Sequence, residues 1–490
     1  MSAYEQLKSR WAEISYLGRG SAILEWDADV MMPPLAAGER GKVMATLSTV
    51  IHEKISDPIL ADLMDKAESE VQTYADKRNL QLMRRHYLLA SQTPAALVYA
   101  LEEARSKATR IWEQSKAESD WAAVQPVLQE SFALFKEQAQ IHADILNCSV
   151  YDAQLSHASI GNTQAVIDPL FGMLKEKLPE LAQRIIEKQK SNPVGDYRLT
   201  IEKQKIIAAK LAEQLGYDFN RGRLDISAHP ASYGTKYDGR ITARYIEDSP
   251  FEGMICVAHE TGHSLYSHNL PDEWETQPVG RASDMSIHES QSLIMEKNAV
   301  LSKEFIPYLY GMIKTEYPEF LAVCSPEQFK NALHQVKPSF IRFEADEATY
   351  PLHVILRYEI EKQLFSGQAQ VADIPELWNT RFKELLGLDV PSHNLGCMQD
   401  IHWYCGLYGY FPVYTQGALY GAQLFAAMKK EMPTIENDLA QGNFTNFNKW
   451  LNRNIHNQGQ LYDAPDLIER ATGERPNAQY FLDHLKNRYL

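Results

Sequence analysis

Apolar residues recur at steps of three and four along most of the chain, a pattern that predicts amphipathic helices. The pattern runs over residues 51–92 and again over residues 94–147. In the second run, one helix face carries Leu97, Leu101, Ala104 and Ala108. A third run covers residues 165–190, and Pro193 and Gly195 then interrupt it. We therefore expect a mainly helical protein.

Residues 225–248 differ from their surroundings. They are rich in Gly, Ser, Thr, Tyr and Ile and predict short strands joined by turns. Helical periodicity resumes after them and continues to the end of the chain. No linker rich in Gly, Ser or Pro divides the sequence, and no internal repeat is visible. The expected fold class is mainly α, one unit over residues 1–490, with a small β element.

Composition narrows the class of partner and compartment. The formal net charge is −15 without a Lys/Arg-rich block, which argues against nucleic acid as partner. No segment holds the roughly 18 uncharged apolar residues that a membrane helix requires, and residues 1–20 lack the apolar core of a secretory signal. The five cysteines are scattered without a CxxC pair, so a reducing cytoplasm is expected rather than a disulfide framework.

The segment with the clearest chemistry is His259-Glu260-Thr261-Gly262-His263, an HExxH pattern. Helical spacing places both histidines on the face that also carries Ile255, Ala258 and Tyr266. Two imidazoles one turn apart can reach one metal ion at about 2.0–2.1 Å. Gly262 lies between them and lets another segment approach closely, at a cost of about 1 kcal/mol in helix stability. The alternative is a pair of core histidines satisfied by hydrogen bonds.

A catalytic zinc ion needs three protein ligands and one open position for water. Glu289 is the favoured third ligand, because the apolar residues around it predict a second helix that could lay a carboxylate against the first. His288 is a rival, as are other acids. Ser286 and Glu289 also fit a capping box, in which the glutamate would only close the start of that helix.

These residue types define a mechanism. Zn²⁺ held by two neutral imidazoles and one carboxylate keeps a net positive charge, which lowers the pKa of its water toward about 7. Glu260 adjoins a ligand without being one, so it can take the proton of the water and pass it to the leaving amine. The expected reaction is amide hydrolysis without a covalent acyl-enzyme.

Four segments besides HExxH resemble motifs of the M32 family of zinc metallocarboxypeptidases, the thermostable carboxypeptidase type. They are residues 238–242 for DxRxT, 288–291 for HESQ, 341–346 for IRxxAD and 396–403 for GxxQDxHW. The stretches "LEWDADVMMPPLAAGER" and "WLNRNIHNQG" are also similar to family segments. The resemblance covers essentially the whole chain and supports Glu289 as the third ligand.

This resemblance implies a two-lobed helical fold around a deep active-site groove, related to the neurolysin and angiotensin-converting-enzyme group. It also implies one Zn²⁺ per chain, for which Co²⁺ could substitute, and a homodimer. The implied activity is the release of single residues from peptides with a free C-terminus, with broad side-chain tolerance and poor cleavage next to proline.

One position departs from the family pattern. His229-Pro230-Ala231 stands where the family usually has His-Pro-Phe, so one wall of the groove loses an aromatic ring. This departure is expected to change the side-chain preference of the groove and to leave the chemistry unchanged. His229 is a substrate-binding candidate, and fixing a neighbouring loop is an equal alternative.

Two arginines are candidates for substrate binding, because a planar guanidinium suits the terminal carboxylate that a carboxypeptidase must hold. Arg342 is the first choice on the family motif, and its alternative is a helix ion pair with Asp346. Arg240 is the second candidate. For it, a structural pairing with Asp238 in a strand-like turn is the favoured alternative.

The oxyanion that forms during attack needs hydrogen-bond donors beyond the metal. The segment "DIHWYCGLYGYFPVY" places aromatic residues beside glycines, and in related groove peptidases a His and a Tyr from the corresponding region do this work. His402 and Tyr410 are therefore the expected catalytic donors, with a lining role as the alternative. Gln399 and Asp400 are candidates to orient a ligand histidine.

Two other functions stay open on the sequence alone. An oligopeptidase that cleaves internally would use the same metal site, and it would still cleave a peptide whose C-terminus is blocked as an amide. A non-catalytic, zinc-stabilised helical scaffold is the other, but such a scaffold would have no use for the base Glu260.

Overall fold

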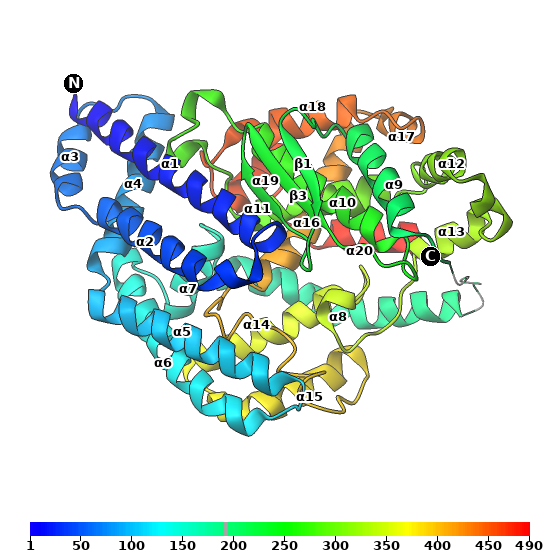
Figure 1. Cartoon of the computed structure of the whole chain (residues 1–490), viewed down its shortest axis with the longest axis horizontal. Helices are drawn as coiled ribbons and strands as arrows, with labels where there is room; N and C mark the ends of the chain where they lie inside the picture. Colours follow the sequence, from blue (N-terminus) through cyan, green and yellow to red (C-terminus); the bar gives the residue numbers. More distant parts are fainter. Residues whose placement is uncertain (191, 193–194, 196) are drawn as a thin grey trace.

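The computed structural model describes all residues of the chain except 191, 193, 194 and 196, so the predicted helix breaker Pro193 lies outside the described residues. Helices make up most of the chain and one small sheet accompanies them, which confirms the mainly helical fold class (Figure 1). Among the described residues, no helix is both long enough and apolar enough to span a membrane.

The first part of the chain is entirely helical between short connections. Its helices are α1 (Ala3–Val30), α2 (Ala37–Ile55), α3 (Ile59–Ala67), α4 (Tyr74–Gln92), α5 (Ala95–Lys116), α6 (Trp121–Leu146), α7 (Val150–Ala158), α8 (Gln164–Gln189) and α9 (Ile201–Leu215). The run predicted over 165–190 therefore matches α8 closely.

The two longer helical runs are each divided into several helices, and side-chain caps mark where two of these helices begin. The Thr73 side chain accepts a hydrogen bond from Asp76 N and starts α4, and Asp120 does the same with Ala123 N at the start of α6. These breaks are too short to disturb the apolar periodicity, so the sequence pattern passes over them.

The predicted β element is a three-stranded sheet. It consists of β1 (Gly222–Ile226), β2 (Ser232–Thr235) and β3 (Asp238–Ala243), in the order β1-β3-β2. Strand β3 runs parallel to β1 and antiparallel to β2. The sheet packs on α10 (Glu252–His268) through buried Ile241, Ala243 and Val257. It therefore supports the helix that carries the HExxH motif.

Helices dominate again after α10. They are α11 (Met285–Leu293) with a π-helical continuation (Ile294–Val300), α12 (Ile306–Glu316), α13 (Pro326–Leu333), α14 (Tyr350–Ser366), α15 (Ile374–Leu386), α16 (Pro412–Glu431), α17 (Ile435–Ala440), α18 (Thr445–Asn454), α19 (Ala464–Thr472) and α20 (Gln479–Tyr489). Segments far apart in sequence meet here: the Phe132 ring of α6 packs on the Phe365 ring of α14.

The expectation of helical structure through to the end of the chain was wrong for residues 387–411. This stretch between α15 and α16 consists of turns and irregular backbone, and it carries the GxxQDxHW motif. Gly406 and Gly409 in it have φ values of +77° and +74°, a conformation that favours glycine. A Cβ at position 406 would also lie 2.0 Å from the Phe135 ring. Both glycines therefore fix an irregular path that the periodicity of nearby apolar residues conceals.

Candidate metal centre

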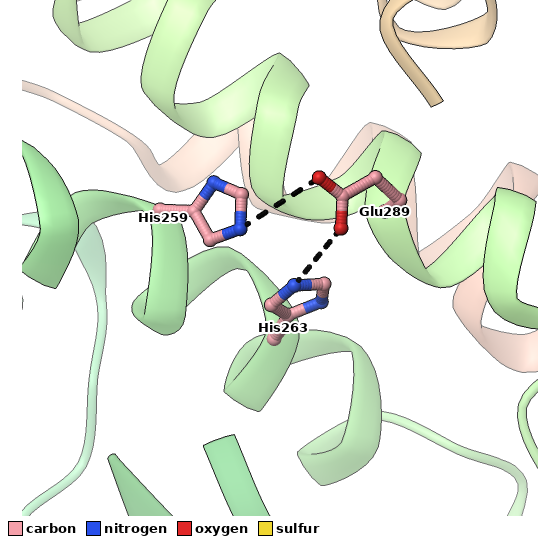
Figure 2. Close-up of side chains that lie close together, drawn as sticks. All are labelled: His259, His263 and Glu289. Atoms are coloured by element: carbon pink, nitrogen blue, oxygen red, sulfur yellow. Dashed lines mark ion pairs between the residues drawn. The ribbon is translucent and has the colours of Figure 1, made fainter. Parts of the chain in front are cut away.

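Two neighbouring helices bring the three predicted metal ligands together. His259 and His263 lie one turn apart on α10, and Glu289 projects toward them from α11 (Figure 2). The Nε2 atoms of the two histidines lie 3.8 Å and 3.4 Å from the two carboxylate oxygens of Glu289. One ligand atom from each residue falls within 4.8 Å of the others, as binding of a single ion requires.

Glycines make this approach possible. A Cβ on Gly262 would lie 2.4 Å from the Gln291 carbonyl oxygen, so α10 and α11 meet there at backbone distance. On the other side of α11, a Cβ on Gly417 of α16 would lie 2.5 Å from Cγ of Glu289. The close approach expected at Gly262 is thus confirmed, and Glu289 is held between two helices.

Each of the two candidate ligand histidines is oriented through its second ring nitrogen. His259 Nδ1 lies 2.8 Å from Glu296 Oε2, and His263 Nδ1 lies 2.6 Å from His288 Nδ1. Partners at Nδ1 fix each ring and leave Nε2 free to face Glu289, the arrangement typical of metal-bound histidines. His288, a rival for the third ligand position, therefore contacts the candidate ligand His263 and lies outside the group that converges.

Glu296 was missed by the sequence analysis. It lies in the π-helical continuation of α11, about two turns beyond Glu289 and thus on the same side of that helix. The expectation that Gln399 and Asp400 orient a ligand histidine was wrong. Gln399 instead accepts a hydrogen bond from Arg342 N, and Asp400 pairs with Arg342 and Arg357.

The capping-box alternative for Glu289 was also wrong. The N-cap of α11 is Asp284, whose side chain accepts a hydrogen bond from Ile287 N at 2.9 Å. The Ser286 hydroxyl donates to the same Asp284 carboxylate. Because Asp284 already closes the helix start, the Glu289 carboxylate is free to face the histidines.

The charges in the centre favour a cation. Burial alone would lower the pKa of His259, but Glu289 and Glu296 outweigh it and raise that pKa to about 9. Burial would raise the pKa of Glu296, yet Lys297 and His259 bring it down to about 2. Carboxylates held ionised beside two imidazoles form a donor set that suits a divalent ion.

Glu260 points to the same conclusion. It is only 6 % exposed, and its Oε2 has no hydrogen-bond partner within the part of the chain that the structure describes. Burial raises the pKa of this carboxyl. A buried, unpartnered carboxylate oxygen is costly, and a site for a metal ion and its water explains why one is kept here. The residues present therefore fit a resident metal ion.

Two of the three candidate ligands, His259 and Glu289, line a cavity of about 500 Å³. Its walls include His259, Glu289, Pro230, Tyr350 and Tyr414. A substrate of several residues can therefore reach the metal ligands from one side.

Comparison with known proteins decides the family. Residues 6–489 match the family model described as Carboxypeptidase Taq (M32) metallopeptidase. The chain belongs to the M32 metallopeptidase family. It is therefore a metallocarboxypeptidase, a peptide hydrolase that depends on a metal ion.

Individual relatives agree with this assignment over full length. Thermostable carboxypeptidase 1 of Thermus thermophilus is 35% identical, with 100% of this chain and 98% of the relative aligned. Carboxypeptidase 1 of Bacillus subtilis is 33% identical over 97% and 96% of the two chains. The solved structure of Pyrococcus furiosus carboxypeptidase has a TM-score of 0.96 at 31% identity, covering 100% of this chain and 99% of that one.

Arg342, in the IRxxAD motif of this M32 protein, lies in a short 3₁₀ turn (Arg342–Glu344) rather than in an α-helix. The alternative of a helix ion pair with Asp346 was wrong, since Asp346 accepts hydrogen bonds from backbone groups such as Ala348 N. Arg342 instead pairs with Asp400 at 3.0 Å, and it is only 8 % exposed. Its role in substrate binding stays a prediction.

His402 and Tyr410 lie close to the cavity wall but are absent from the described residues that line it. His402 Nε2 lies 3.1 Å from the Tyr414 hydroxyl, and Tyr414 does line the cavity. Burial lowers the pKa of His402 to about 3, so its imidazole is neutral. The Tyr410 ring packs 5.4 Å from that of Tyr414. Their roles as oxyanion donors stay predictions.

The remaining candidates lie in or next to the sheet. Arg240 on β3 forms two hydrogen bonds of 2.8 Å to Asp238 and stacks over Trp26, the structural pairing given as its alternative. His229 is exposed, and its carbonyl oxygen accepts a hydrogen bond from Ser227 Oγ. Next to it, Pro230 lines the cavity. The departure at Ala231 therefore falls beside the cavity wall.

Proposed function

We propose that this M32 protein is a zinc-dependent carboxypeptidase that releases single C-terminal residues from peptides. One observation carries the proposal: His259, His263 and Glu289 converge within 4.8 Å, beside the buried Glu260 carboxyl with its unpartnered oxygen. Two imidazoles and one carboxylate, with room for water, form the donor set of catalytic zinc sites. Co²⁺ accepts the same donors and is expected to substitute.

The protein's residues divide the chemistry between them. His259, His263 and Glu289 would hold the ion, and when bound it would supply a Lewis acid that polarises the peptide carbonyl and acidifies water. Glu260 takes the proton of the attacking water and delivers it to the leaving amine. Burial raises the pKa of Glu260, which favours the protonated form in which it donates to the leaving amine.

Other properties rest on the family resemblance and on the cavity. A cavity of about 500 Å³ with both apolar and polar walls supports broad side-chain tolerance. The proposal also includes poor cleavage next to proline, two lobes around a groove, a homodimer and a cytoplasmic location. These properties rest on the family resemblance or on composition.

Mass spectrometry of one digested peptide tests the activity and the metal together. A free-acid peptide should shorten stepwise from its C-terminus, and a chelator should abolish the shortening until Zn²⁺ is restored. The same peptide with a C-terminal amide should survive. Internal cleavage of the amidated peptide would instead show an oligopeptidase, and hydrolysis that persists after complete metal removal would contradict the proposal.

A further inference from the structure

Tyr350 faces the cavity that holds the metal ligands, although it belongs to none of the sequence motifs. It begins α14, is half-buried, and lines the cavity together with His259 and Glu289. Its ring packs edge-to-face on Tyr414 at 6.1 Å. A phenol in this position can reach a peptide bound at the metal centre.

Arg342 lies directly behind Tyr350. Its Nη1 donates a hydrogen bond to the Tyr350 hydroxyl oxygen, and its Nε donates to Asp400 at 3.0 Å. Arg342 is absent from the described residues that line the cavity. Because the phenol oxygen already accepts from Arg342, the phenol hydrogen is directed elsewhere and is available to an acceptor in the cavity.

The charges behind the phenol favour an anion. Arg342 and Arg357 share the single carboxylate of Asp400, with Arg357 Nε 2.7 Å from it. Two guanidiniums against one carboxylate leave a net positive charge in a buried region, where electrostatic interactions are weakly screened. Tyr350 lies between this charge and the cavity.

We propose that Tyr350 is a substrate-binding residue whose hydroxyl donates a hydrogen bond to the terminal carboxylate of the peptide. Arg342 is then a positioning residue that acts on the carboxylate through Tyr350. This inference rests on the proposed carboxypeptidase function. It accounts for a buried Arg342, which the sequence had suggested as the direct ligand of that carboxylate.

Binding in a catalytically silent background tests the role. In Glu260→Gln protein loaded with Zn²⁺, calorimetry compares a free-acid tripeptide with its C-terminal amide. The free acid should bind more tightly, and adding Tyr350→Phe should reduce that preference about tenfold or more, as expected for a lost hydrogen bond to a charged group. Arg342→Lys should reduce it as well, and the double variant should lose less than the sum of the two effects.

Steady-state kinetics of active protein, in which Glu260 is retained, separate substrate binding from chemistry. Tyr350→Phe should raise KM for a free-acid peptide with kcat nearly unchanged, whereas the matched change Tyr99→Phe at an exposed site on α5 should leave both constants at wild-type values. Equal zinc content and melting temperature show that the variants are folded and loaded. An unchanged acid-to-amide preference, or a lower kcat at constant KM, would overturn the inference. If wild-type protein fails to trim free-acid peptides at all, the proposed function fails first.

Discussion

Glu296 Oε2 lies 2.8 Å from Nδ1 of His259, the ring nitrogen opposite the one that faces Glu289. The carboxylate therefore orients the candidate metal ligand His259 from behind, and it does so from the helix that carries Glu289, the third candidate ligand.

Replacing Glu296 should weaken metal binding. Glu296→Gln keeps the size of the side chain but loses the charge that orients His259, so zinc affinity should fall about 10- to 100-fold. Competition with a chromogenic chelator measures this affinity directly. Glu252→Gln is the matched control, because Glu252 lies on the rim of the same cavity and pairs with exposed Arg244. Equal affinities in the two variants would contradict the assigned role.

Glu260→Gln should separate metal binding from catalysis. Glu260 is outside the ligand group, so the variant should keep one zinc per chain. Its peptide hydrolysis should fall about 10²- to 10⁴-fold, the usual contribution of a general base. Metal analysis and timed peptide digestion on the same sample check both statements. Normal hydrolysis in a zinc-loaded variant would remove the proposed mechanism.

Gly262→Ala should push α10 and α11 apart. The added methyl would meet the Gln291 carbonyl oxygen at 2.4 Å, and overpacking of this kind costs about 1–3 kcal/mol. Gly172 provides the comparison, because the Cβ of an alanine there would meet open space on α8. Gly172→Ala should raise the melting temperature slightly, since alanine favours helix by about 1 kcal/mol. Gly262→Ala should lower it and also weaken zinc binding.

Buried Glu361 should make stability fall as pH rises. It is fully buried on α14 and accepts hydrogen bonds from Trp403 Nε1, Gly409 N and the Tyr151 hydroxyl. Burial outweighs these donors and raises its pKa from 4.5 to about 7. Between these values the folded state keeps a proton that the unfolded state has released. This group's contribution to the free energy of unfolding is therefore fully present below pH 4.5 and is lost as the pH rises through 7. The loss amounts to up to about 3 kcal/mol.

Comparison with Glu361→Gln isolates this group, because other titrating residues are common to both proteins. Relative to wild type, the variant should gain stability between pH 4.5 and pH 7.5. Melting temperatures in matched buffers measure the difference. A difference that stays constant across this range would show that Glu361 does not titrate there.

The sequence predicted the helical class, the β element and the residues of the metal centre, because these depend on local periodicity and on the spacing of unusual residue types. The sequence did not predict the helix breaks at Thr73 and Asp120, because the apolar pattern continues across them. It did not predict the irregular stretch 387–411 either. There, buried contacts far along the chain, such as Gly406 against Phe135, override local preference.

Within the site, the sequence predicted that the candidate metal ligands and Glu260 lie together, but not the residues that surround them. Glu296 is a second acidic residue on the same helix face as Glu289, which the sequence does show. The neighbouring residues do not indicate that it contacts His259. Tyr350 gives no signal in the sequence, since a tyrosine at the start of a helix is common. The pairing of Arg342 with Asp400 joins residues 58 positions apart, and such contacts become visible only in the folded chain.

Gly417 has a practical consequence for protein engineers who wish to transplant this centre. Helices α10 and α11 together carry all three proposed metal ligands, yet the side chain of Glu289 also packs against the backbone of α16 at Gly417, which has no side chain. A graft of the helix pair alone would leave the Glu289 side chain unsupported, free to swing among rotamers. A reduced protein that reproduces this centre therefore needs a third helix, with a glycine that faces the side chain of Glu289.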